Sequence, residues 1–154
     1  MLKTLARHGV EFVVVGGIAG ALHGSSSITF DLDICHSRTF ENLDCLEASL
    51  KQLGARLRGA PKDIVFLLDA STLRAGDKFT FATTLGDLDC LGSPAGTNGF
   101  DDLNANAVEM DIEGMKIRVV SLNDLIRMKR ASGRPKDRIE LEVLGALREE
   151  LEKG

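Results

Sequence analysis

The apolar positions of the chain follow two periods, one typical of strands and the other typical of helices. The run EFVVV at 11–15 is continuously apolar and rich in β-branched residues, which predicts a strand buried on both faces. Helical spacing predicts a helix over 39–53, with Thr39 as its N-cap and Gly54 just past its end. Its inward face is expected to carry Phe40, Leu43, Leu46, Leu50 and Leu53.

Shorter patterns predict the elements around these two. Alternating residues at 107–112 and 115–120 flank a Glu113-Gly114 turn, which predicts a β-hairpin. The segment 62–75 contains the run DIVFLLDA, which fits either a strand or part of a loop-rich crossover. Further short helices are expected over 2–8 and 18–24, and further strands over 28–36, 78–84 and 86–92.

Two helices are predicted at the C-terminal end. Ser121 and Asp124 resemble a capping box that starts a helix running to about Ala131. Pro135 suits the first position of a final helix. The residues of that helix expected to face inward are Ile139, Val143, Ala146, Leu147 and Leu151.

Together these elements predict an α/β or α+β fold with a small mixed central sheet, flanking helices and a helical C-terminal tail. The 154 residues are expected to form one domain, with its core at about 1–120 and its tail at about 121–154. The net charge of −4 provides no general basic field for a nucleic-acid backbone, so such a partner would need a local basic patch.

The cysteines and the N-terminal segment indicate a cytoplasmic protein. Cys35, Cys45 and Cys90 are odd in number and lack CxxC spacing, which disfavours a disulfide framework or a zinc knuckle. Charged residues interrupt every short apolar run near the N-terminus. We therefore expect no signal peptide and no membrane association.

The stretch GGIAGALHGSSSITFDLDI, at 16–34, carries the candidate chemistry. A dinucleotide-binding unit would require G-x-G-x-x-G, a longer crossover helix and a single acidic residue about 20 positions further on. Here the helical piece is short and the acidic residues form a pair, Asp31 and Asp33. This alternative is therefore disfavoured.

Asp31 and Asp33 would project from the same face of a strand, about 6.5–7 Å apart. Two carboxylates placed in this way repel each other, and Mg²⁺, or Mn²⁺ in its place, would neutralise them and attract phosphates. Backbone N–H groups at Gly16 and Gly17, at the start of a helix, would cradle the same phosphates. The stretch thus predicts a phosphate loop and a metal site that share one pocket.

A third carboxylate on a neighbouring strand would allow two metal ions to be held together. The segment LGDLDCLG offers Asp87 and Asp89. We favour Asp89 because it lies within an apolar run, whereas Asp87 follows Gly86 at the edge of the strand.

The combination of VVVGGIAGALHG, TFDLDI, LDCLG and SLNDLIRMKRASGRPKD resembles the polymerase-β-type nucleotidyltransferase superfamily. It is most similar to the small bacterial AbiEii/AbiGii toxin-like group, over nearly the whole chain. The resemblance implies a nucleotidyltransferase fold and a Mg²⁺-dependent transferase. The implied reaction moves a nucleoside monophosphate from an NTP, such as ATP, to a hydroxyl group and releases pyrophosphate.

The resemblance also implies roles for individual residues. Gly16 and Gly17 would hold the triphosphate, and Asp31 and Asp33 would bind both metal ions. Asp89 would be the third ligand and the base for the incoming hydroxyl. Relatives often carry a basic residue where this chain has Ser27, so the expectation is either weaker phosphate binding or contacts from the hydroxyls of Ser25 to Ser27 instead. The positive charges expected to contact the phosphates are Lys129, Arg134 and Lys136.

The hydroxyl acceptor stays open between a small alcohol such as an aminoglycoside, a protein hydroxyl and a tRNA 3′ end. The chain has no Trp or Tyr for base stacking, and Phe30 and Phe40 are expected in the core. The alternative function is a non-catalytic module that binds nucleotide or a protein partner, such as an antitoxin or a second copy in a homodimer. An Asp89 side chain that points away from Asp31 and Asp33 would favour binding alone.

Overall fold

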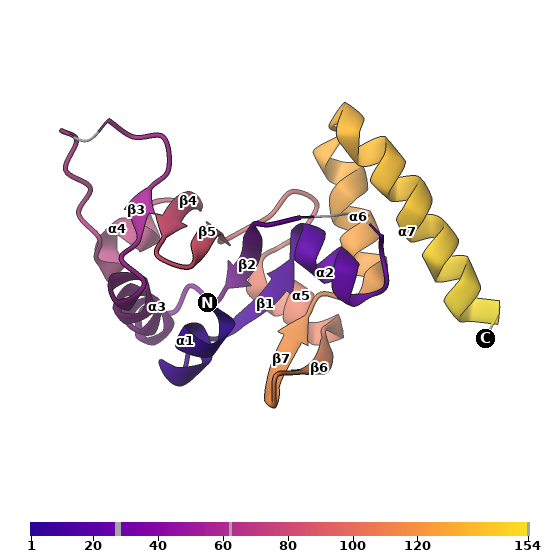
Figure 1. Cartoon of the computed structure of the whole chain (residues 1–154), viewed down its shortest axis with the longest axis horizontal. Helices are drawn as coiled ribbons and strands as arrows, with labels where there is room; N and C mark the ends of the chain where they lie inside the picture. The colour runs from indigo at the N-terminus through magenta and orange to yellow at the C-terminus, as the bar shows by residue number, and fades with distance from the viewer. Residues whose placement is uncertain (27–28, 62, 154) are drawn as a thin grey trace.

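The computed structural model describes residues 1–26, 29–61 and 63–153, and a mixed β-sheet lies at its centre (Figure 1). Within the described residues the sheet has seven strands in the order β3-β4-β5-β2-β1-β7-β6. They are β1 (Phe12–Val15), β2 (Leu32–His36), β3 (Arg56–Leu57), β4 (Lys78–Thr83), β5 (Gly86–Leu91), β6 (Val108–Ile112) and β7 (Met115–Val119).

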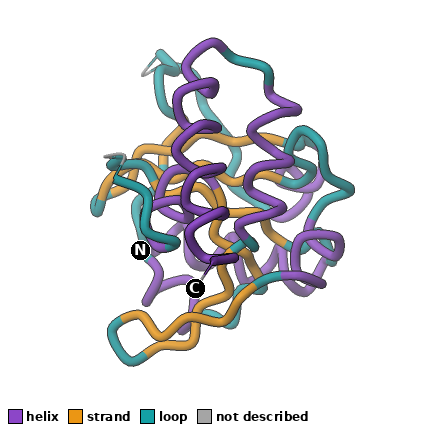
Figure 2. Tube along the Cα trace, turned by 90° about the vertical axis from the view of Figure 1, so that its right-hand side faces the viewer, coloured by secondary structure: helices purple, strands orange, loops and turns teal. Residues whose placement is uncertain are grey.

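Helices pack around this sheet in two groups. Near β3 and β4 lie α3 and α4, whereas α2 packs on β1 and β2 and contacts α6 (Figure 1). The last two helices, α6 and α7, lie side by side (Figure 2). No helix of the described residues is both long and apolar enough to span a membrane. The helices are α1 (Leu2–Arg7), α2 (Gly16–Leu22), α3 (Phe40–Gln52), α4 (Ala70–Ala75), α5 (Phe100–Asn106), α6 (Leu122–Ser132) and α7 (Pro135–Lys153).

The register of the central strands decides which side chains share a face. β2 runs antiparallel to β1 and parallel to β5. In the β2–β5 pair, Asp33 lies opposite Asp89, so both carboxylates stand on the same face of the sheet. The neighbouring pair, Leu32 and Leu88, points to the other face and is buried in the core. Burial of the apolar residues thus holds the two acidic residues in line.

The structure confirms the predicted fold class and most predicted elements. All four residues of β1 are buried, as expected of a strand covered on both faces. Both predicted N-caps form, because the Thr39 hydroxyl accepts a hydrogen bond from the Asn42 amide and the Ser121 hydroxyl accepts one from the Asp124 amide.

Some elements differ from the prediction. The ambiguous segment is an irregular loop from residue 63 to Asp69, followed by α4, whereas residue 62 lies outside the described residues. The strand expected over 28–36 begins at Leu32, and residues 27–28, which include Ser27, also lie outside the described part. The sequence pattern missed β3 and α5 because both are too short to show a period.

The predicted inward face of α7 is wrong in part, although Leu147 packs against the core as expected. Ile139 is 71% exposed and Leu151 is 60% exposed, whereas Leu144 is buried against the core. The reason is the buried carboxylate of Asp137, which is held by the end of α6 and turns the helix so that Asp137 and Leu144 face inward.

The prediction that Phe30 and Phe40 lie in the core is also wrong. Phe30 is 86% exposed, in the segment that leads into β2. Phe40 is 56% exposed because it is the first residue of α3, where its ring stacks beneath the Arg74 guanidinium at 4.2 Å.

Candidate functional site

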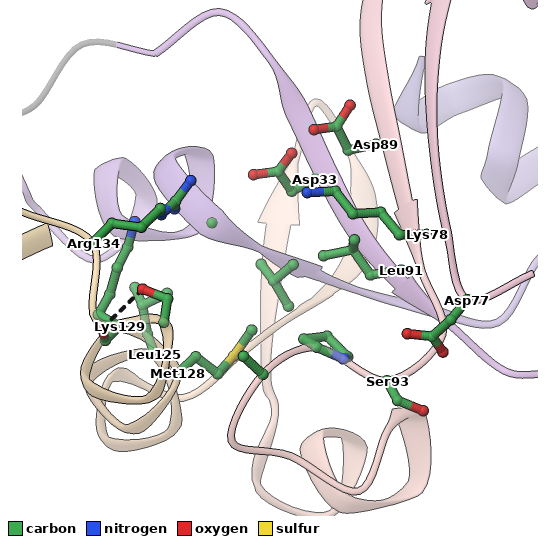
Figure 3. A pocket seen from close by; sticks show the side chains of 15 residues that line it. Asp33, Asp77, Lys78, Asp89, Leu91, Ser93, Leu125, Met128, Lys129 and Arg134 are labelled. Carbon is green, nitrogen blue, oxygen red and sulfur yellow. Dashed lines mark hydrogen bonds between the residues drawn. The ribbon is translucent and has the colours of Figure 1, made fainter. Parts of the chain in front are cut away.

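A cavity of about 440 Å³ lies between the face of the sheet that carries Asp33 and the helix α6 (Figure 3). Its wall is formed by the β1–α2 junction, by β2, β4 and β5, by the loop that follows β5, and by α6 with the turn that follows it. The charged side chains that line it are Asp33, Asp77, Lys78, Asp89, Lys129 and Arg134. Apolar side chains such as Leu91, Leu125 and Met128 line the rest of the cavity.

Asp33 and Asp89 form the acidic part of this cavity. Their strands pair in register, so the two carboxyl groups lie beside each other (Figure 3). Burial, the negative charge of Asp89 and a hydrogen bond between the two groups raise the pKa of Asp33 well above its usual range, and the charge of Asp31 adds to this effect. The pair is therefore destabilised by its own negative charge unless a proton or a cation is shared between the two groups.

Gly16 makes the position of Asp33 possible. This glycine has a φ of +69°, and a Cβ atom added to it would overlap the carboxylate of Asp33. Only glycine combines this backbone conformation with a free path for the carboxylate. Gly17 leaves space for the side chain of Thr29 in a similar way. The contacts of both glycines with a triphosphate stay a prediction.

The structure separates the three predicted acidic ligands. Asp89 lines the cavity with Asp33, whereas Asp31 lies just before β2, is half-buried and does not line the cavity. Asp87, the alternative third carboxylate, is also absent from the lining. Within the described residues no set of three or more acidic, histidine or cysteine side chains is assembled that could hold a metal ion. A three-carboxylate site therefore stays a prediction, and the cavity itself presents two of the three.

Arg58 is a residue of the site that the sequence analysis missed. It follows the two-residue strand β3, and its Nη2 donates a hydrogen bond of 2.9 Å to Oδ1 of Asp89. Its Nη1 lies 3.4 Å from Oδ2 of Asp87, which makes the guanidinium a bridge between the two acidic residues. No sequence signal pointed to it, because the segment around β3 has no period from which its direction could be read.

The predicted basic residues of the tail are occupied by ion pairs. Lys129 lies 2.6 Å from Glu140 and 3.4 Å from Asp137, and Arg134 donates to Asp137 at 3.0 Å. Burial acts to raise the pKa of Asp137, but hydrogen bonds from Ser132 and Arg134 and the charges of Lys129 and Arg134 lower it to about 2. Lys129 and Arg134 thus line the cavity with most of their charge already balanced.

Two other predicted residues lie at different places. Lys136 is exposed on α7 and does not line the cavity. Ser25 lines a narrow hollow next to Gly16, Gly17 and Lys129, behind the β1–α2 junction. The structure therefore brings Ser25 near the predicted phosphate loop and leaves Lys136 outside it.

Lys78 is a second residue that the sequence analysis missed. It extends from β4 across β5 toward Asp33 (Figure 3). Among the described residues, no carboxylate lies within ion-pair distance of its ammonium group. Lys78 lies here because it pairs with Leu91 and therefore shares a face with Asp89, a register that the alternation at 78–84 alone does not give.

The residues present suit a divalent cation. Carboxylate oxygens are the hard ligands that Mg²⁺ and Mn²⁺ prefer. A cation between Asp33 and Asp89 would also relieve the repulsion that raises the pKa of Asp33. The chemistry of the donor set therefore agrees with the metal that the sequence predicts.

The mixed sheet with its flanking and C-terminal helices is a nucleotidyltransferase-like fold, similar to that of polymerase-β-like nucleotidyltransferases. No family model and no curated protein matches the chain. At the identities given below, the similarity to solved structures concerns the fold alone.

Three solved structures illustrate this similarity. The lincosamide antibiotic adenylyltransferase LnuA, solved with lincomycin bound, has a TM-score of 0.63 and 13% identity, over 95% of this chain and 92% of that one. TM1012 from Thermotoga maritima, a protein assigned as a nucleotidyltransferase, has a TM-score of 0.53 and 19% identity, over 99% and 91%. The antibiotic-resistance factor ANT(2'')-Ia has a TM-score of 0.55 and 18% identity, over 99% and 87%.

Proposed function

We propose that the chain is a divalent-metal-dependent nucleotidyltransferase, which transfers a nucleoside monophosphate from an NTP to a hydroxyl group and releases pyrophosphate. The observation that carries the proposal is the pair Asp33 and Asp89, which faces a cavity in a fold shared with nucleotidyltransferases. Fold alone does not define an activity. The support comes from the half-buried carboxylate pair at the place where this cavity also offers cationic side chains.

The acidic pair would hold the metal ion, and Asp31 would join it as a ligand from the segment before β2. A bound Mg²⁺ ion would neutralise the triphosphate and polarise its α-phosphate. Asp89 would accept the proton of the incoming hydroxyl group at its carboxylate. Catalysis of this kind depends mainly on positioning and charge, which suits a rigid sheet with fixed register.

Other residues of the cavity wall would bind the phosphates. Gly16 and Gly17 would present backbone N–H groups, with Ser25 beside them. Lys78 has the strongest case among the cations, because it points toward Asp33 and no described carboxylate neutralises it. Lys129 and Arg134 would contribute less, since Asp137 and Glu140 already share their charge.

The proposed acceptor is a small molecule with a free hydroxyl group. Two observations support this choice: the net charge of −4 disfavours a nucleic-acid backbone, and the lining of the cavity is partly apolar. Of the similar structures named above, LnuA is a lincosamide antibiotic adenylyltransferase and ANT(2'')-Ia is an antibiotic-resistance factor. The motif resemblance to the AbiEii/AbiGii toxin-like group supports a protein or tRNA acceptor instead, and the acceptor screen below separates these outcomes.

The first test is calorimetric titration of each of the four NTPs, with and without Mg²⁺. The proteins are the wild type, Asp33→Asn and, as matched control, Asp44→Asn, which changes an exposed acidic residue of α3. We expect Mg²⁺-dependent binding in the wild type and the control, and its loss in Asp33→Asn. Equal binding by all three would remove Asp33 from the site.

A second step tests transfer itself. An NTP labelled at its α-phosphate is incubated with aminoglycosides, lincosamides, purified tRNA and the protein alone. Label on a small molecule supports the proposed acceptor, and label on tRNA or protein replaces it. Binding without any transfer would favour the non-catalytic alternative.

A further inference from the structure

Arg58 binds one of the two carboxylate oxygens of Asp89, the group that a metal ion at this residue would need. Its Nη2 lies 2.9 Å from Oδ1 of Asp89, which is the length of a charge-assisted hydrogen bond. Two further hydrogen bonds fix the position of Arg58. Its amide donates to the Thr80 carbonyl at 2.9 Å, and its Nη1 donates to the Phe81 carbonyl at 3.4 Å. The guanidinium is therefore held over Asp89 by the backbone of β4.

A guanidinium and a divalent cation cannot share this carboxylate at low cost. A carboxylate oxygen would bind Mg²⁺ at about 2.1 Å, which places the ion within a few ångströms of the guanidinium. Two positive charges at this separation repel each other strongly in a half-buried cavity. Binding of a metal ion at Asp89 therefore requires Arg58 to move.

Asp87 provides the place to which Arg58 can move. It stands two residues before Asp89 on the same face of β5, and its carboxylate lies 3.4 Å from Nη1 of Arg58. The side chain of Asp87 is more exposed than that of Asp89, at 38% against 15%. The arginine can thus keep one acidic partner while it gives up the other.

We propose that Arg58 is a positioning residue that neutralises Asp89 while the site is empty and shifts to Asp87 when the metal ion and NTP bind. This inference rests on the proposed function, because it assumes that Asp89 is a metal ligand. Its consequence is that Asp89 becomes available only when the negative triphosphate accompanies the metal. Free divalent cations are bound weakly, and metal that arrives with nucleotide is bound tightly.

The test measures binding of Mn²⁺ alone, from the electron paramagnetic resonance signal of the unbound ion. Arg58→Gln is compared with the wild type and with Arg56→Gln. Arg56 is the matched control because it lies two residues away on β3, is exposed and has no ion pair among the described residues. We expect Arg58→Gln to bind Mn²⁺ about tenfold more tightly than the wild type, and Arg56→Gln to stay within about twofold of it.

A second variant tests whether Asp87 is the partner to which Arg58 shifts. Asp87→Asn should weaken binding of Mn²⁺ together with an ATP analogue that cannot be cleaved at its α-phosphate, by about fivefold. In the Arg58→Gln background the same substitution should have a clearly smaller effect, because no arginine then needs a second partner. An equal effect in both backgrounds would show that Asp87 acts only through its charge.

The outcomes separate this inference from the proposed function. One outcome is that the wild type binds Mn²⁺ with the analogue but Arg58→Gln binds Mn²⁺ alone no better than Arg56→Gln. This outcome would refute competition between Arg58 and the metal ion for Asp89 and would leave the transferase proposal standing. If no variant binds Mn²⁺ with or without the analogue, the metal site is refuted and both proposals fall. A misfolded Arg58→Gln protein would bind less Mn²⁺, so tighter binding cannot arise from damage.

Discussion

The carboxylates on the sheet side of the cavity and the cations on its α6–α7 side are balanced in different ways. On the α6–α7 side, Lys129 and Arg134 are paired with Asp137 and Glu140 from the same pair of helices. On the sheet side, Asp33 has no cation within ion-pair distance among the described residues, and its pKa is raised. The charges on the helical side are paired within the protein, whereas on the sheet side the carboxylate of Asp33 has no paired cation among the described residues.

This difference shows that an unpaired charge in a cavity wall is stronger evidence for a bound ligand than a charge already paired within the protein. The paired charges of α6 and α7 stabilise the fold by fixing how α7 docks. The surplus charge of Asp33 has no structural benefit in the empty protein, so it is the part that points to an external cation. Removal of a carboxylate should therefore lower stability on the helical side and raise it at Asp33.

The largest effect on stability is expected for Asp137→Asn, on the paired side. Loss of this buried carboxylate leaves Arg134 without its partner and Lys129 with only Glu140. We expect the free energy of unfolding at pH 7 to fall by about 2–3 kcal/mol. Urea denaturation followed by circular dichroism measures it, with Glu142→Gln, an exposed position of α7, as control.

The same residue predicts a pH dependence with a definite sign. The pKa of Asp137 is lowered from 3.8 to about 2 in the folded protein. Its contribution is therefore complete above pH 3.8 and is lost as the pH falls toward 2. The wild type should lose this stability in that window, and Asp137→Asn should not. Parallel curves for the two proteins would contradict the role of the ion pairs.

Gly16→Ala is expected to have the next largest effect, on the sheet side. The substitution strains a backbone with φ of +69° and pushes the carboxylate of Asp33 aside. We expect a loss of about 2 kcal/mol in stability together with loss of Mg²⁺·NTP binding. Gly145→Ala is the matched control, since that glycine lies within α7 with open space around it, and the change should stabilise the protein slightly.

Lys78→Gln compares the cations of the two sides. Lys78 is expected to be worth about tenfold in affinity for Mg²⁺·NTP because it brings an unpaired charge to the cavity. Arg134→Gln should cost about threefold or less, since that charge is shared with Asp137. Lys136→Gln, outside the cavity, should leave the affinity unchanged. A larger loss for Arg134 than for Lys78 would reverse the comparison between the two sides.

The smallest change in stability, with the opposite sign, is expected for Asp33→Asn. The amide removes the repulsion between Asp33 and Asp89, so the metal-free protein should gain about 1 kcal/mol at pH 8. The thermal midpoint in buffer with a chelator measures this gain. A loss of stability would mean that Asp33 has a structural role and that its charge is not in surplus.

The sequence allowed the elements with a clear period to be predicted. β1 is a short, fully apolar run, and the hairpin of β6 and β7 alternates around a glycine turn, so both are local features. Gly16 and Asp33 could also be predicted, because the glycine turn and the strand that carries Asp33 are close together in the sequence.

The remaining parts of the site depend on tertiary contacts. The meeting of Asp33 with Asp89 requires the register of two strands that are distant in the sequence, and Arg58 enters the site from a strand of two residues. The sequence pointed to Lys129 and Arg134 of the tail, which line the cavity, but not to their ion pairs, because composition does not tell a paired lysine from a free one. The same ion pairs explain why the inward face of α7 was mispredicted.

The register between β2 and β5 has a consequence for how the protein can be purified. A slip of one residue in β5 would place Leu88 or Cys90 at the cavity and turn Asp89 to the opposite face. No intermediate arrangement exists, because side chains of a strand alternate strictly. A ligand that needs both carboxylates would then bind correctly paired molecules and not slipped ones. An immobilised NTP could therefore separate the two populations in a refolded sample.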